Sequence, residues 1–152
     1  MQARRPKQSS CTLDLCPRVR YEEIEHTADV GIRAFGSTMN ELFANAAEGM
    51  FSLIADLSKV RTIGEVEVRT ASEDPGELMV QWLTELLFLH ETQRLLLREF
   101  DVTIEDGQLQ ARARGERIDK RRHELRLVVK AATYYRLRVD PDAGVAEIIF
   151  DI

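Results

Sequence analysis

The stretch DPGELMVQWLTELLFL, residues 74–89, decides the class of fold. Asp74 is a favourable helix N-cap, Pro75 suits the first helical position, and Glu77 follows three residues after the cap. The rest of the stretch is apolar around most of the circumference of a helix. We therefore expect a helix that other elements cover on more than one side.

A second helix is predicted upstream, over residues 38–57. Thr38 and Glu41 form a T-x-x-E capping box shortly after Gly36, which ends the preceding predicted strand. Apolar residues then recur at helical spacing over about five turns, namely Met39, Leu42, Phe43, Ala46, Ala47, Met50, Phe51, Ile54 and Leu57. One face of this helix should belong to the core.

The segments around these helices alternate apolar and polar residues, which predicts strands. The predicted strands are residues 21–26, 30–35, 61–70, 102–104, 109–113, 125–129, 134–139 and 145–152. Asp106-Gly107 is a strong signal for a tight hairpin turn. The pattern favours an α+β fold with two main helices packed against mostly antiparallel sheets, in a single compact domain.

Length and composition agree with one folded domain preceded by a short extension. The chain has 152 residues, of which 44% are hydrophobic and 31% charged. We interpret residues 1–19 as a flexible basic leader without a secretory apolar region, and residues 20–152 as the domain. Cys11 and Cys16 lie in the leader, and we interpret them as incidental reduced thiols of a cytoplasmic protein.

The charge distribution argues against a general nucleic-acid binder. The first 20 residues carry five cations and one anion, whereas the rest of the chain carries 16 cations and 25 anions. Because phosphate binding depends on massed Lys and Arg, we expect no direct nucleic-acid binding. No run approaches the roughly 18 apolar residues of a membrane span, so no membrane association is expected either.

Two polar points interrupt the apolar pattern. The first is His26-Thr27-Ala28-Asp29, which is either a simple hairpin turn or a rigid turn that presents Asp29, beside His26, to a metal or partner. The second is the chain end, where an apolar strand runs into Asp151 and Ile152. Two carboxylates with backbone or chain-end oxygens would suit a hard cation such as Ca²⁺ or Mg²⁺ rather than zinc.

Other ionisable residues have both structural and functional interpretations. His90 ends a buried helix and is interpreted as structural, and His123-Glu124 as a solvated connector. Lys130 follows an apolar run and is expected to need a carboxylate partner, which Asp29 or Asp151 would supply. A basic run is interpreted as the solvated face of a strand, with a phosphate- or acidic-partner-binding edge as the alternative; it comprises Arg112, Arg114, Arg117, Lys120, Arg121, Arg122 and Arg126.

Five motifs in order resemble the archease family, from about Tyr21 to Ile152. They are residues 25–31 (EHTADVG), Glu41-Leu42-Phe43 with Ala46-Ala47 and Met50, residues 82–87 (WLTELL), residues 130–134 (KAATY), and Phe150-Asp151-Ile152. The family pattern commonly continues from Thr-Tyr into His, where this chain has Tyr135. The basic leader is also unusual for the family.

The resemblance implies a protein cofactor rather than an enzyme. It implies activation of the GTP-dependent tRNA-splicing RNA ligase, by promoting guanylylation of its active-site histidine and multiple turnover. It also implies a divalent metal site, usually calcium, with magnesium or manganese as alternatives. The ligands carried over are Asp29, Asp151 and Ile152, with His26 and Lys130 as residues that shape the site.

Two other functions stay open at this point. One is a chaperone-like modulator of a tRNA methyltransferase, a role that has been suggested for the family. The other is a metal-dependent phosphohydrolase that uses Asp29 and His26. The chain contains no G-x-S-x-G, P-loop or H-E-x-x-H motif, which weakens the case for an enzyme.

Overall fold

The computed structural model describes residues 19–25 and 29–152. Its two helices are α1, Met39–Ile54, and α2, Pro75–Gln93, with the short 3-10 helix η2, Leu57–Lys59. The strands are β1, Tyr21–Glu25; β2, Val30–Phe35; β3, Gly64–Ala71; β4, Leu95–Glu105; β5, Gln108–Arg117; β6, Ala131–Ala132; β7, Arg138–Asp140; and β8, Val145–Asp151.

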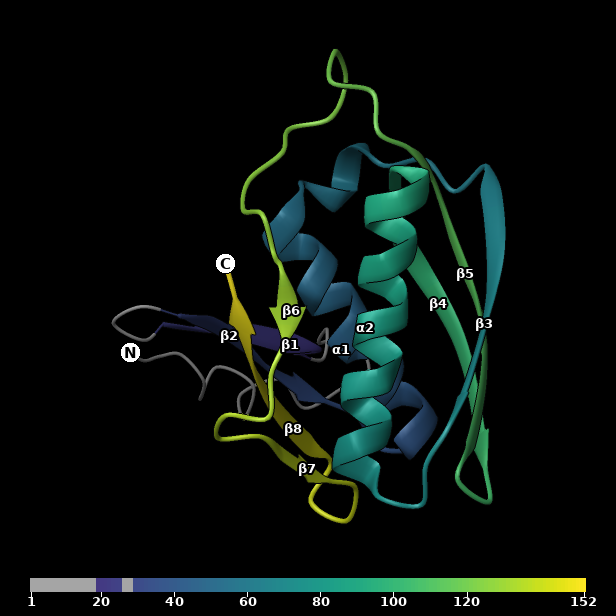
Figure 1. Cartoon of the computed structure of the whole chain (residues 1–152), viewed down its shortest axis with the longest axis vertical. Helices are drawn as coiled ribbons and strands as arrows, with labels where there is room; N and C mark the ends of the chain where they lie inside the picture. The colour runs from purple at the N-terminus through teal and green to yellow at the C-terminus, as the bar shows by residue number, and fades with distance from the viewer. Residues whose placement is uncertain (1–18, 26–28) are drawn as a thin grey trace, which may run out of the picture.

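The strands form two antiparallel sheets. One has the order β1-β2-β8-β6, with β7 also paired to β8, and the other has the order β3-β5-β4. Both helices lie between the two sheets, with β3, β4 and β5 on one side and β2, β7 and β8 on the other (Figure 1). The chain is thus a single compact α+β domain, as the sequence pattern predicts.

The predicted caps form as expected. The Thr38 hydroxyl accepts the Glu41 N–H at 3.1 Å, and the Asp74 carboxylate accepts the Glu77 N–H at 2.9 Å. Each side chain satisfies a backbone donor that the first turn leaves without an intrahelical partner. These caps fix where α1 and α2 begin.

The core lies where the helices meet the sheets, and Trp82 joins the two helices there. Its side chain is fully buried, and its indole N–H donates to the carbonyl of Phe43 in α1 at 2.9 Å. The indole also contacts Phe100 of β4 edge-on, at 6.1 Å between ring centroids. The burial of α2 between two sheets confirms that this helix needs cover on more than one side.

The hairpin between β4 and β5 forms at the predicted turn. Asp106 has φ 51° and Gly107 has φ 75°, so both central residues are left-handed, as a two-residue turn of this kind requires. A Cβ on Gly107 would lie 2.8 Å from the carbonyl oxygen of Ser72. The position therefore suits glycine both in conformation and in space.

The predicted strand over residues 125–129 is wrong. This segment forms only an isolated bridge, between Leu125 and Ala55. Its backbone instead donates to the end of α1, from Arg126 to the Ile54 carbonyl at 2.7 Å and from Leu127 to the Leu53 carbonyl at 3.1 Å. Alternating apolar residues indicate only that one face of a segment is buried. A segment that packs on the end of a helix shows the same pattern as a strand.

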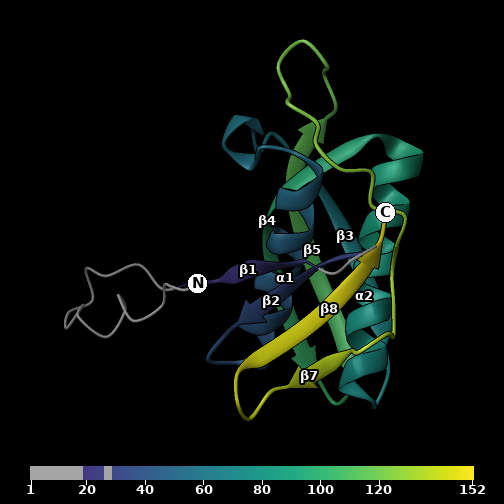
Figure 2. The same cartoon turned by 90° about the vertical axis from the view of Figure 1, so that its left-hand side faces the viewer.

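The predicted strand over residues 134–139 is also largely a turn. Only β7, Arg138–Asp140, is strand, and Leu137 donates its N–H to the Tyr134 carbonyl at 3.2 Å. Arg136 has φ 51°, a left-handed conformation that a strand does not contain. The chain leaves the sheet in this turn after β6, and it returns as β7, which pairs antiparallel with β8 as β6 does (Figure 2).

None of the helices in the described ranges is long and apolar enough to span a lipid bilayer.

Candidate functional site

The start of β2 and the end of β8 bring two of the predicted ligands to the same end of one sheet. The antiparallel β2–β8 register pairs Val30 with Phe150. Asp29 directly precedes Val30, and Asp151 directly follows Phe150. Asp29 and Asp151 therefore both lie next to this register pair, at the same end of the sheet, although they come from opposite ends of the described chain.

A third segment holds the end of β8 in place. Lys130 donates its backbone N–H to the carbonyl of Asp151 at 2.8 Å, and Ala131 of β6 pairs with Asp151. Thr133 donates both its N–H and its hydroxyl to the Ile149 carbonyl, at 3.1 and 2.7 Å. These bonds keep β8 ordered almost to Ile152, which is partly exposed. We call Asp29, Lys130, Asp151 and Ile152 the acidic tip.

The donor chemistry of the acidic tip fits a hard cation. Asp29 is half-buried and Asp151 is exposed, and both offer carboxylate oxygens, as does Ile152 if its carboxylate ends the chain. His26 lies outside the described residues. Within residues 19–25 and 29–152, no three His, Cys, Asp or Glu side chains gather closely enough to hold a metal by themselves. A cation here would take further oxygens from backbone or water.

Lys130 belongs to the acidic tip through its backbone rather than through an ion pair. Its side chain is exposed, so its ammonium does not require a buried carboxylate. None of the ion pairs found among the described residues involves this ammonium. Tyr135, at the position where the family commonly has His, is also exposed, and the Arg136 guanidinium lies 5.5 Å from its ring centroid.

A second polar cluster, which the sequence did not predict, lies around Glu116. This side chain is only 3% exposed, yet it accepts hydrogen bonds from the Arg61 backbone N–H at 2.8 Å, from Arg122 at 2.7 Å and from His123 at 2.8 Å. The Arg61 guanidinium adds a bond at 3.1 Å. Burial raises the pKa of Glu116, but these donors outweigh it and lower the pKa to about 2.

The Glu116 cluster corrects the interpretation of His123 as part of a solvated connector. His123 is buried, and its Nδ1 accepts the Asp119 N–H at 2.8 Å, so its proton lies on Nε2 and points to Glu116. The only trace of this pair in the sequence is that Glu116 and His123 lie seven positions apart, on either side of a turn. That spacing does not reveal that both side chains are buried.

The basic run is divided between two environments. Arg112 and Arg114 of β5 lie opposite glutamates on the neighbouring strands β3 and β4, at 3.6 to 3.9 Å. Arg122 is bound to Glu116, whereas Arg121 is almost fully exposed. The solvated-face interpretation therefore holds for Arg112 and Arg114.

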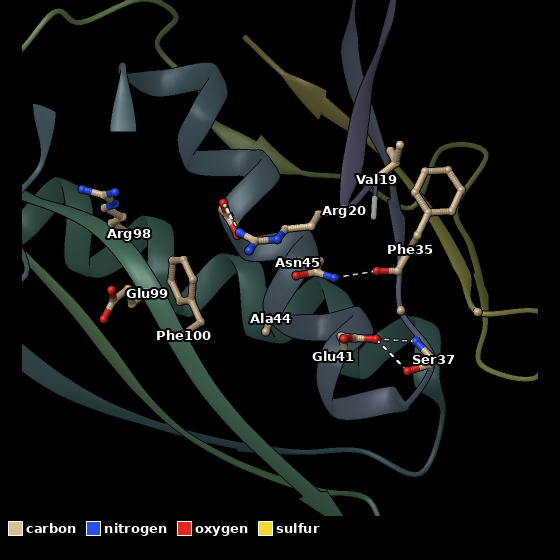
Figure 3. A pocket seen from close by; sticks show the side chains of 13 residues that line it. Val19, Arg20, Phe35, Ser37, Glu41, Ala44, Asn45, Arg98, Glu99 and Phe100 are labelled. Atoms are coloured by element: carbon tan, nitrogen blue, oxygen red, sulfur yellow. Dashed lines mark hydrogen bonds and ion pairs between the residues drawn. The ribbon is translucent and has the colours of Figure 1, made fainter. Parts of the chain in front are cut away.

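A groove of about 1030 Å³ lies along α1, between β2 and β4 (Figure 3). Its polar side chains already have internal partners. Asn45 donates to the Phe35 carbonyl at 2.7 Å, Glu41 accepts both N–H and hydroxyl from Ser37, and Arg20 pairs with Glu48 at 3.1 Å. These contacts fix β1 and β2 against α1, and we assign the groove a structural role.

His90 is structural, as predicted. Its Nδ1 lies 2.8 Å from the Leu95 carbonyl, and its ring meets Phe51 edge-on at 5.9 Å. The imidazole joins the end of α2 to the start of β4 across a tight left-handed residue, Arg94, with φ 58°.

Comparison with known proteins identifies relatives over nearly the whole described chain. Residues 21–152 match the model of the archease protein family. The chain is 38% identical to the archease of Sulfurisphaera tokodaii over 80% of this chain and 88% of that protein. It is 39% identical to the archease of Methanopyrus kandleri over 87% of this chain and 99% of that protein.

Two solved structures share the fold. The solution structure of a Methanobacterium thermoautotrophicum protein superposes with a TM-score of 0.75 at 38% identity, covering 87% of this chain and 98% of that one. A crystal structure from Thermotoga maritima, described as an archease and possible chaperone, superposes with a TM-score of 0.57 at 20% identity and supports the fold alone. It covers 90% of this chain.

Proposed function

The chain belongs to the archease family, and from that premise we propose that it is a non-catalytic cofactor of the GTP-dependent tRNA-splicing RNA ligase. In this proposal it promotes guanylylation of the ligase's active-site histidine and permits multiple turnover. The working end of the molecule is the acidic tip. The observation that carries the proposal is the β2–β8 register, which joins Asp29 and Asp151 at one end of a sheet.

The acidic tip suits this role because it is rigid and projects from a strand end. The backbone bonds of Lys130 and Thr133 hold β8 on one side, and β2 holds it on the other. A cofactor that enters a partner's active site must keep its charged groups in fixed positions, because loose groups lose affinity to ordering costs. The tip needs no nucleophile of its own.

A divalent cation, calcium in the first instance, fits the donors of the tip. Asp29 and Asp151 would bind it through carboxylate oxygens and Ile152 through a backbone or chain-end oxygen, while Lys130 orients the strand end. When bound, the cation supplies a local positive charge that balances the two carboxylates. Magnesium and manganese accept the same oxygen ligands and are the alternatives.

The test is a guanylylation assay of the purified cognate ligase with GTP and Mn²⁺, with and without this protein, at single and multiple turnover. We expect strong stimulation by the wild type and a loss of at least about tenfold in Asp29→Asn and Asp151→Asn, equivalent to ~1.4 kcal/mol in the activated step. Asp101→Asn is the matched control, since Asp101 is an exposed carboxylate on the other sheet.

Full stimulation by both tip variants would contradict the role of the tip. Absence of any stimulation by the wild type would contradict the proposed function itself. Turnover of a phosphoester by the protein alone with Mg²⁺ or Mn²⁺ would instead support the phosphohydrolase alternative.

A chaperone-like effect on a tRNA methyltransferase is the second candidate. The exposed apolar side chains Phe88, Leu125 and Val128 are compatible with it, because exposed apolar surface is typical of a site that binds another protein. Suppression of methyltransferase aggregation on heating, by a protein that leaves ligase guanylylation unchanged, would distinguish this role from the first.

A further inference from the structure

Exposed apolar side chains gather beside the last turns of α2. Phe88 on the outer face of this helix is 58% exposed, and Leu125 and Val128 on the neighbouring extended segment are 42% and 74% exposed. Together with Thr84, Glu91 and Leu127 they line a groove of about 420 Å³ between α2 and residues 125–131. We call this the α2 groove. Large apolar side chains left in water at one place are typical of an interaction site.

The exposure of Val128 follows from how its segment is anchored. The N–H groups of Arg126 and Leu127 donate to carbonyls at the end of α1 at 2.7 and 3.1 Å, which fixes the extended backbone. In this anchored segment Val129 is buried, whereas its neighbour Val128 is 74% exposed. Packing within this chain therefore leaves most of the Val128 side chain in water.

Charge around the α2 groove limits what can cover it. Arg94, Arg126 and Lys130 line it, against the single carboxylate of Glu91. A second copy of the chain packed on the same face would bring these cations together, which is unfavourable. RNA would satisfy the cations but would leave the aliphatic side chains of Leu125 and Val128 without apolar partners. A protein surface with apolar side chains bordered by carboxylates satisfies both.

The α2 groove is continuous with the acidic tip. Lys130 and Ala131 belong to its lining, and these same residues bond and pair with Asp151 through the backbone. A partner seated in the groove would thus be held next to Asp151. We propose that the α2 groove is the docking surface for the partner ligase, which contributes an apolar segment bordered by carboxylates. This inference rests on the proposed function, and it separates docking at the groove from activation at the tip.

The experiment measures the affinity of the purified cognate ligase for this protein by titration calorimetry, together with guanylylation as the protein is titrated. Val128→Asp places a carboxylate in the lining of the groove, and we expect it to raise the Kd by at least about tenfold. Phe88→Ser, on the helix side, should act in the same direction. Ile63→Asp is the matched control, because Ile63 is 72% exposed but does not line the groove.

The two parts of the surface should respond differently. Val128→Asp should restore stimulation at high protein concentration, because its tip is intact, whereas Asp151→Asn should bind the ligase but stimulate poorly even when saturating. A cooperative thermal unfolding transition shows that each variant is folded. If Val128→Asp does not fold, Phe88→Ser provides the test of the groove.

A Kd for Val128→Asp and Phe88→Ser equal to that of the wild type would overturn the docking proposal while leaving the proposed function intact. An equal rise in the Kd of Ile63→Asp would also overturn the docking proposal, since any added surface charge would then weaken binding. The choice of partner is overturned if the wild type stimulates guanylylation but shows no measurable binding to the ligase. It is also overturned if the wild type binds the tRNA substrate and Val128→Asp abolishes that binding. A wild type that neither binds nor stimulates the ligase overturns both proposals.

Discussion

Glu116 lies at the centre of a group of hydrogen bonds that fixes the loop after β5. Its carboxylate accepts from Arg61, Arg122 and His123, and the Asp119 N–H closes the loop on the other side of the His123 ring. A buried carboxylate is stable only when donors replace the water it has lost. The cluster therefore connects the loop after β5 to Arg61, which precedes β3.

The lowered pKa of Glu116 predicts a specific pH dependence of stability. The pKa falls from 4.5 to about 2 on folding, so the unfolded chain binds the proton more readily than the folded one. The contribution to the free energy of unfolding is fully present above pH 4.5 and is lost as the pH falls toward 2. It amounts to about 3 kcal/mol at neutral pH.

Glu116→Gln should remove this contribution, because the amide cannot carry the charge that Arg61 and Arg122 face. We expect the variant to be less stable by about 3 kcal/mol at pH 7, in urea unfolding, and to converge on the wild type near pH 2. Glu99→Gln is the control, since Glu99 is exposed and lies 3.6 Å from Arg114, a pair worth at most about 1 kcal/mol. Equal effects of the two substitutions at pH 7 would refute the argument.

The three-stranded sheet depends on one glycine in its central strand. Gly115 of β5 pairs with Gly64 of β3 and with Leu97 of β4, where the β4–β5 register shifts between Leu97 and Glu99. A Cβ on Gly115 would lie 1.8 Å from the carbonyl oxygen of Leu96. The backbones approach so closely at this irregularity that only glycine fits between them.

Gly115→Ala should therefore destabilise the protein by about 3 kcal/mol or more, at or above the upper end of overpacking costs. The matched control is Gly64→Ala, its register partner, where the nearest atom would lie at an ordinary 3.5 Å. We expect the control to change the free energy of unfolding by less than about 1 kcal/mol. Thermal unfolding of the two variants tests this, and similar melting temperatures would show that the sheet relaxes around the added methyl group.

Elements whose signals are local could be predicted from the sequence, and elements fixed by distant contacts could not. The caps at Thr38 and Asp74 and the turn at Asp106-Gly107 act within a few residues, and all three are confirmed. Residues 125–129 were wrongly predicted as a strand, because their partner is the end of α1 rather than another strand. The buried Glu116–His123 pair was missed for a related reason, since burial depends on elements that the local sequence does not contain.

Strands β2 and β8 join opposite ends of the described chain. Five of the six β2 residues pair with β8 at positions 145–149, and Val30 pairs with Phe150 next to the acidic tip. Asp29 and Asp151 approach each other only when this part of the sheet is folded. Any ligand that needs both carboxylates must therefore bind the folded chain in preference to the unfolded one, and must stabilise it.

This coupling predicts the effect of calcium on stability. At a concentration of about 100 times its Kd, Ca²⁺ should stabilise the wild type by ~2.7 kcal/mol, and a chelator should reverse the gain. For a domain of this size the melting temperature should rise by about 2–4 °C per kcal/mol. Asp29→Asn and Asp151→Asn should lose most of the rise, whereas Asp101→Asn should keep it.

The same variants without calcium give an independent check on the arrangement. If the two carboxylates repel each other in the metal-free protein, removing one charge should leave the melting temperature equal to that of the wild type or slightly higher. In chelator, the melting temperature of the wild type should then be equal to or lower than that of Asp29→Asn and Asp151→Asn. In calcium, it should be higher than that of both variants. A melting temperature that rises equally with calcium in all four proteins would place the cation elsewhere, and the acidic tip would have to act on its partner through its carboxylates alone.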